Sequence, residues 1–141
     1  MIQIVKDTRP WFFLQTTHST YGMRVMETGH LEHLYYGERI TVDTQDSAFC
    51  APLVIQRGFA PGNTCTYDRE HPQISMEDVC LEVGTLGRGD IREPFLEVKF
   101  TDGSVTSDFT FDSYEVITLK EREQCLQASG LPRSYSEVET D

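Results

Sequence analysis

The stretch YGMRVMETGHLEHLYYG, residues 21–37, decides the fold. It contains two runs of apolar and aromatic residues, 21–26 and 31–36, separated by a short break that includes Gly29. Glycine takes the positive φ of a tight turn without a steric penalty, and apolar runs on both sides of such a turn are typical of paired strands. We therefore expect an antiparallel hairpin that belongs to a larger sheet.

The second arm of this hairpin has two different faces, because successive side chains of a strand point in opposite directions. The expected faces are Leu31, His33 and Tyr35 on one side, and His30, Glu32, Leu34 and Tyr36 on the other. On this assignment His30 and His33 cannot bind one metal ion together, since they lie on opposite faces. We interpret both histidines as structural, and we expect the paired tyrosines to pack within the fold rather than against a sugar.

Further strand signals lie on both sides of this hairpin. Residues 11–16, WFFLQT, are aromatic and apolar, and residues 95–100, FLEVKF, alternate with a period of two. The second run continues through the turn dipeptide Asp102-Gly103 into residues 105–117, VTSDFTFDSYEVI. This predicts a second hairpin with one buried face, made by Leu96, Val98 and Phe100. Together these signals predict an all-β protein with antiparallel strands.

The middle of the chain has a different composition. Residues 41–73 contain Pro52, Pro61 and Pro72 together with two glycines, which predicts a long irregular excursion. Good helix formers are concentrated only in residues 120–128, KEREQCLQA. With 141 residues and no internal repeat, the whole chain 1–141 is expected to form a single domain.

The charge balance excludes some classes of partner. The chain has 23 acidic and 12 basic residues and a net charge of −11. Nucleic acids and anionic membrane surfaces favour clustered lysine and arginine, so we expect neither as a partner.

The chain also shows no sign of export or of a membrane span. No run reaches the roughly 20 apolar residues of a span, and Lys6, Asp7 and Arg9 interrupt the N-terminal apolar residues. We expect a cytoplasmic protein. The cysteines are widely spaced without a CxxC pair, which favours reduced thiols over a disulfide framework or a zinc site. They are Cys50, Cys65, Cys80 and Cys125. No metal and no cofactor is expected.

The stretch LGRGDIREP, residues 86–94, is dense in glycine and charge. A glycine-rich loop binds phosphate when a helix follows it, but here a strand is expected after Pro94. We therefore predict that Asp90 forms a local ion-pair and turn network with Arg92 and Glu93. No known catalytic motif is present, and a pair of carboxylates cannot be nominated for glycosidic chemistry without geometry.

Three segments, in this order, carry a resemblance to a known family. They are TYGMRVMETGHLEHLYYG (20–37), EVGTLGRGDIREPFLEVKFTDGSVTSDFTFDSYEVI (82–117) and GLPRSYSE (130–137). This series resembles the N-terminal domain of bacterial α-galactosidases of glycoside hydrolase family 36, over roughly residues 11–138. Its most specific pieces are GHLEHLYYG, GRGDIREP and LPRSY.

The resemblance implies a particular place in a larger enzyme. Such enzymes have an N-terminal β-supersandwich, a central (β/α)8 barrel with both catalytic aspartates, and a small C-terminal β domain. The resemblance therefore implies that the chain is an antiparallel β-sandwich, a truncated first portion of the supersandwich without the barrel. It is expected to hold no catalytic residue and to be inactive alone. The full-length enzyme would hydrolyse terminal α-galactosides such as melibiose and raffinose. This domain would serve as scaffold and subunit contact, and the isolated chain would self-associate.

The resemblance also suggests one substrate-binding residue. In some relatives an N-terminal-domain loop helps to shape the substrate pocket, and the matching region of this chain contains Arg57. The alternative is a stand-alone β-sandwich module that binds carbohydrate or mediates assembly without catalysis.

Overall fold

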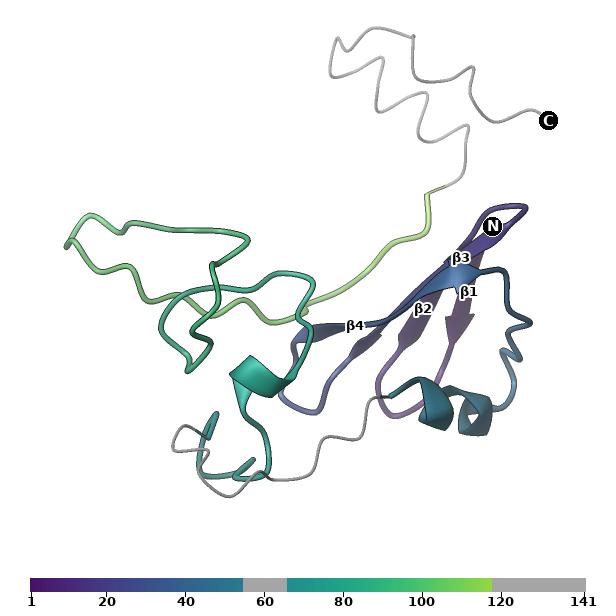
Figure 1. The fold of residues 1–141 in the computed structure, drawn as a ribbon, viewed down its shortest axis with the longest axis horizontal. Coiled ribbons are helices and arrows are strands. Elements are labelled where there is room, and N and C mark those ends of the chain that lie inside the picture. The colour runs from purple at the N-terminus through teal and green to yellow at the C-terminus, as the bar shows by residue number, and fades with distance from the viewer. Residues whose placement is uncertain (55–65, 118–141) are drawn as a thin grey trace, which may run out of the picture. The chain divides into compact units, whose positions relative to one another are not determined.

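The structure, a computed structural model, describes residues 1–54 and 66–117 (Figure 1). The chain divides into two compact units, residues 1–111 and 112–141. The described part of the second unit is residues 112–117, and the fold described below is that of the first. In the described residues no helix is long and apolar enough to cross a membrane.

The regular structure of the first unit is a four-stranded antiparallel sheet with two short 3-10 helices. Its strands are β1 (Ile2–Val5), β2 (Trp11–Gln15), β3 (Ser19–Val25) and β4 (Leu31–Glu38), in the order β1-β2-β3-β4. The helices are η1 (Ser47–Leu53) and η2 (Met76–Asp78). The expected hairpin is confirmed: β3 and β4 are joined by a turn in which Gly29 has a φ of 87°.

A β-bulge in this hairpin corrects the predicted faces of β4. Gly22 pairs with Tyr35 and Met23 pairs with His33, so Leu34 is an extra residue without a partner on β3. One extra residue reverses the alternation beyond it. The prediction that His33 and Tyr35 share a face is therefore wrong, and Tyr36 lies on the face of His33.

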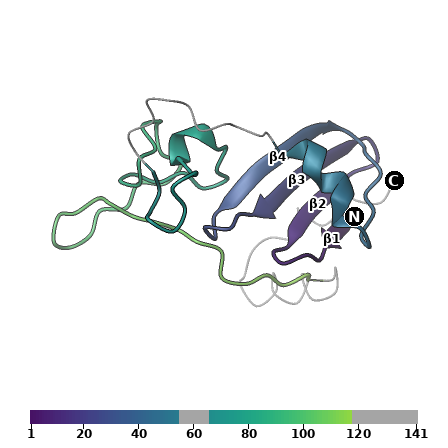
Figure 2. The same cartoon turned by 90° about the horizontal axis from the view of Figure 1, so that it is seen from below.

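The first face of the sheet carries the hydrophobic core. Val5, Phe13 and Cys50 are fully buried, and Phe49 and Leu53 pack against them. Cys50, Phe49 and Leu53 belong to η1, which lies across the sheet (Figure 2). Burial, with a smaller effect of nearby aspartates, raises the pKa of the Cys50 thiol to about 11.

The second face is only partly covered. At one end of the sheet Phe12 packs against Phe111, with ring centroids 5.9 Å apart. At the other end Ile2, Leu14, Tyr21 and Tyr36 lie directly opposite one another across all four strands. We call these four residues the open row, because Ile2, Leu14 and Tyr36 are 50%, 38% and 73% exposed. The strands of the described residues thus form a single layer, and the second layer of the expected sandwich is not among them.

The predicted second hairpin forms its turn but not its strands. Gly103 has a φ of 88°, and the Phe100 amide donates to the Ser104 carbonyl at 2.9 Å. Residues 95–100 are not in a strand, and Leu96 and Phe100, expected to be buried, are 41% and 47% exposed. The prediction of a buried face is wrong here, because no other strand or layer of the described residues covers these side chains.

Candidate functional site

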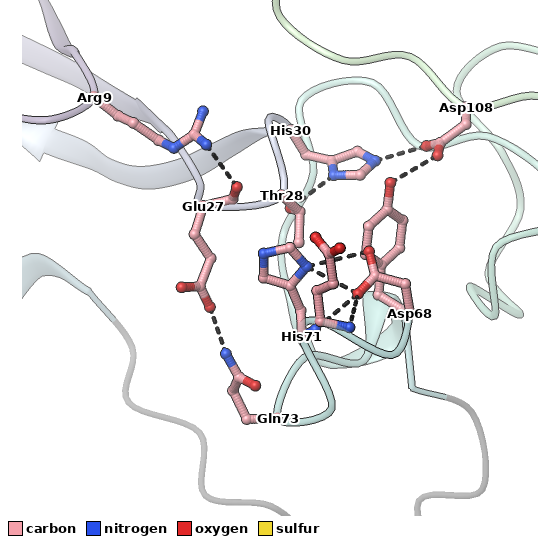
Figure 3. A network of polar contacts seen from close by, with 10 residues as sticks. Arg9, Glu27, Thr28, His30, Asp68, His71, Gln73 and Asp108 are labelled. Atoms are coloured by element: carbon pink, nitrogen blue, oxygen red, sulfur yellow. Dashed lines mark hydrogen bonds and ion pairs between the residues drawn. The ribbon is translucent and has the colours of Figure 1, made fainter.

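A buried histidine lies where the β3–β4 turn meets the segment that follows the sheet (Figure 3). The His30 side chain is 4% exposed and its two ring nitrogens have different partners. Nε2 lies 2.7 Å from Asp108 Oδ1, and Nδ1 lies 2.8 Å from Thr28 Oγ1. Because an ionised carboxylate only accepts hydrogen bonds, Nε2 is the donor to Asp108.

Asp108 is the centre of this arrangement. Its second oxygen accepts from the Tyr67 hydroxyl at 2.9 Å and from Arg88 Nε, also at 2.9 Å. The Tyr67 ring meets the His30 ring edge to face at 5.1 Å, and Arg88 stacks over Tyr67 at 5.6 Å. Burial and the bond to Asp108 raise the pKa of Tyr67. We call His30, Tyr67, Arg88 and Asp108 the His30 network.

The His30 network positions backbone rather than exposing a reactive group. The Phe111 amide donates to the Gly29 carbonyl at 2.7 Å, so the chain on both sides of Asp108 is fixed beside the turn. His30 and Asp108 are 4% and 16% exposed, and each is bonded to protein groups. The bonds of His30 and Asp108 thus hold the turn and the later segment together.

Outer contacts brace the same turn (Figure 3). Gln73 donates to the Glu27 carboxylate at 2.7 Å, and the nearby His71 Nδ1 lies 2.9 Å from Asp68 Oδ1 within the local turn 68–71. Arg9 donates to the Glu27 carbonyl at 2.8 Å. Within residues 1–54 and 66–117, no three histidine, cysteine or acidic side chains converge as a metal site would require.

The predicted ion pair in LGRGDIREP is confirmed for Asp90 and Arg92. Arg92 donates through Nε and Nη2 to the two oxygens of Asp90 at 2.8 and 2.7 Å. Nη2 also donates to the carbonyls of Met76 and Val79, at 2.9 and 2.7 Å. The hydrogen bonds from Arg92 lower the pKa of Asp90 and hold the loop against η2.

A shallow depression lies beside this ion pair. Its volume is about 260 Å³, and it is open to solvent. Its lining residues are Cys80, Leu81, Gly84, Asp90, Arg92, Glu93 and Phe95. Acidic, basic, thiol and aromatic side chains therefore meet around one small space.

A third polar cluster lies on the second face of the sheet. The Tyr21 hydroxyl donates to Glu82 Oε2 at 2.5 Å, and His33 Nδ1 lies 3.2 Å from Oε1 of the same carboxylate. Burial, with a contribution from Glu82, raises the pKa of Tyr21 to about 12. His33 is thus a structural partner of Glu82, which attaches residues 80–82 to the edge of β4.

Arg57, the substrate-binding residue that the sequence suggested, lies outside the described residues. The His30 network was missed by sequence reasoning, because its members are far apart along the chain. The available signal was the conjunction of GHLEH, GRG and the later Asp-Phe pair, which supply His30, Arg88 and Asp108. The structure brings these separate motifs into one contact.

Comparison with known proteins gives a consistent result. The family model for the glycosyl hydrolase family 36 N-terminal domain matches residues 29–141. Over 130 residues the chain is 36% identical to the bifunctional α-galactosidase/sucrose kinase AgaSK of Mediterraneibacter gnavus, covering 91% of this chain and 13% of that protein. It is 27% identical over 130 residues to α-galactosidase AgaA of Geobacillus stearothermophilus, covering 92% of this chain and 16% of AgaA.

Two solved structures are similar to this chain. The α-galactosidase from Lactobacillus brevis aligns with a TM-score of 0.66 and 30% identity, covering 79% of this chain and 14% of that one. The galactosidase domain of AgaSK aligns with a TM-score of 0.64 and 29% identity, covering 79% of this chain and 15% of that one. The chain therefore spans about one seventh of the length of these proteins.

Proposed function

The chain belongs to the glycosyl hydrolase family 36 N-terminal domain family, and from that premise we propose that it is the non-catalytic first domain of an α-galactosidase. The observation that carries the proposal is the family match over residues 29–141. The complete protein would hydrolyse terminal α-galactosides, such as melibiose and raffinose, through residues outside this chain. Retaining hydrolysis uses a nucleophile and an acid/base carboxylate that flank the scissile bond. We assign no catalytic residue to this domain.

The proposed role of the domain is to act as scaffold and contact surface. Three members of the open row are substantially exposed, and an apolar sheet face is normally buried against a second layer. In the complete protein this second layer would come from polypeptide that follows the described residues, which would complete a β-sandwich. In the isolated chain a second copy would cover the open row, and the chain would self-associate.

An activity assay tests the enzymatic part of the proposal. The complete gene product is expected to hydrolyse an aryl α-galactoside, whereas the 141-residue chain is expected to show no hydrolysis above the buffer rate. A complete gene product that leaves both the aryl α-galactoside and melibiose intact would contradict the proposal. Hydrolysis by the 141 residues alone would contradict the assignment of catalysis to residues outside them.

Sedimentation velocity tests the contact role. The isolated chain is expected to sediment faster as its concentration rises, and the substitution Tyr36→Ser should shift it toward the monomer. Ile91→Ser is the matched control, because Ile91 is 85% exposed but lies outside the open row. A monomeric wild type across the whole range, or equal effects of both substitutions, would show that the open row is not an association surface.

Arg57 stays a prediction as a substrate contact. In the complete enzyme, Arg57→Ala would raise KM for melibiose if the side chain binds the sugar. An unchanged KM would remove it from the binding site.

A further inference from the structure

The depression beside Asp90 and Arg92 has walls that are already fixed. Arg92 is held by the Asp90 carboxylate and by the Met76 and Val79 carbonyls. The Phe95 amide donates to the Gly84 carbonyl at 3.0 Å, so the backbone of Phe95 is anchored at the depression. Its side chain is nevertheless 79% exposed. A site with fixed polar walls and an exposed aromatic ring requires little reorganisation to bind a ligand.

The charges of the lining residues decide the class of ligand. Asp90 and Glu93 are acidic and Arg92 is basic, so the depression has a net charge of about −1 at neutral pH. The whole chain has a net charge of −11, which disfavours phosphates and other anions. A compact cation is not favoured either, because Asp90 is paired with Arg92 and, among the described residues, no three acidic, cysteine or histidine side chains converge as a cation site would require. A neutral ligand that both donates and accepts hydrogen bonds fits best.

The aromatic ring narrows this class further. A pyranose has an apolar face for stacking on an aromatic ring, and it has hydroxyl groups around its rim. Its hydroxyls can donate to the Glu93 carboxylate and accept from Nη1 of Arg92, since Nε and Nη2 already donate to protein groups. Hydrogen bonds to charged groups are the stronger kind. The volume of about 260 Å³ is below the roughly 300–1,000 Å³ of typical ligand pockets, which favours one sugar unit over a long chain.

We propose that this depression is a binding site for a single unit of a neutral saccharide, with Phe95 as the stacking surface and Glu93 and Arg92 as the polar contacts. The proposal goes beyond the function proposed above, because it assigns a ligand to this domain itself. It holds whether or not the complete protein is an α-galactosidase, so the two ideas fail separately. A failed hydrolysis assay leaves this site standing, and a failed titration leaves the enzymatic assignment standing.

Titration of the 141-residue chain with melibiose, followed by NMR chemical shifts, tests the site. An open depression of this size predicts saturable binding with a Kd on the order of 1 mM. The substitutions Phe95→Ala and Glu93→Gln should each weaken binding about tenfold, as expected for a lost stacking surface or a lost charged contact. Ile91→Ala is the matched control, because Ile91 is 85% exposed and does not line the depression.

The outcomes separate clearly. Loss of binding in Phe95→Ala with unchanged binding in Ile91→Ala supports the site, provided that circular dichroism shows the same fold for both variants. No saturable binding by the wild type overturns the proposal, as do equal affinities for all variants. Inorganic phosphate serves as a second probe, and phosphate binding in place of melibiose would overturn the assignment to a neutral ligand.

Discussion

The sheet region, residues 1–54, and the segment of residues 66–111 are stabilised in different ways. Apart from glycine, six buried residues of the sheet region are apolar and four are polar, and Val5, Phe13 and Cys50 form its fully buried apolar core. In the segment, three of the four buried residues are polar; the four are Ser75, Met76, Thr85 and Ser107. The segment has one short helix and a single bridge to β4, whereas the sheet region has four paired strands. Burial of apolar area is spread over many contacts, but polar anchoring depends on a few groups, so single substitutions should affect the two regions differently.

The largest effect is expected in the sheet region. Phe13 is fully buried between β2 and η1, so Phe13→Ala would remove a core ring and leave a cavity, at a cost of about 3–5 kcal/mol in the free energy of unfolding. A domain with a total stability of about 5–15 kcal/mol would be close to unfolding after such a loss. Urea denaturation followed by circular dichroism measures the change.

The neighbouring residue provides the control for this prediction. Leu14 is 38% exposed and lies on the opposite face, so Leu14→Ala should cost about 1 kcal/mol or less. Measurements at low concentration avoid a contribution from self-association. If both substitutions cost the same, the apolar core is not the main source of stability in the sheet region.

A smaller and local effect is expected in the segment. Asp108→Asn keeps the shape of the side chain but removes the charge that accepts from His30 and Arg88, at a cost of about 1–3 kcal/mol. Because the bonds of Asp108 attach the segment to the turn, the cost should appear as local opening. Amide hydrogen exchange should speed up at Phe111, which donates to Gly29, and stay unchanged in β2.

Asp112→Asn is the control for this prediction, because Asp112 is exposed and its carboxylate accepts from the adjacent Ser113. If Asp108→Asn speeds up exchange in β2 as much as at Phe111, the two regions unfold as one cooperative unit. The distinction between them would then be one of composition alone.

The same contrast explains what the sequence could predict. The β3–β4 hairpin was predictable because glycine and alternation are local signals. The Asp90–Arg92 ion pair was predictable because the two residues lie only two positions apart in the sequence. The β-bulge at Leu34 was not predictable, since a bulge breaks the alternation from which the two faces of a strand are assigned. β1 has only four residues and is too short for a clear periodic signal.

Longer-range features were harder to predict. His30 and Asp108 are 78 residues apart in the sequence, and no periodic pattern predicts their contact. The one available signal was the joint presence of the motifs that contain His30, Arg88 and Asp108. In residues 95–100 apolar and charged side chains alternate as in a strand with one buried face. Such a strand forms only where another layer covers its apolar face. The described residues supply no such layer, so a correct local pattern led to a wrong statement about burial.

The smallest effect concerns the charge of Asp90. Hydrogen bonds from Arg92 lower the pKa of Asp90 below its usual 3.8, so folding favours the ionised carboxylate. Stability from such a group is fully present above its unfolded pKa and is lost as the pH falls through the folded value. Arg92 is 44% exposed, so solvent screens the pair and the contribution is modest.

Comparing the wild type with Asp90→Asn at pH 7 and below pH 3 isolates this contribution. The variant should be less stable at pH 7, and the gap in unfolding free energy should narrow as the pH falls through the lowered pKa of Asp90. For Asp112→Asn, the difference in unfolding free energy from the wild type should not change in this way with pH, because this substitution leaves the Asp90–Arg92 pair intact. A gap of constant size would mean that the shape of the side chain, and not its charge, holds the loop against η2. The segment would then be held by neutral hydrogen bonds at the Asp90 loop and by charged hydrogen bonds at the His30 network.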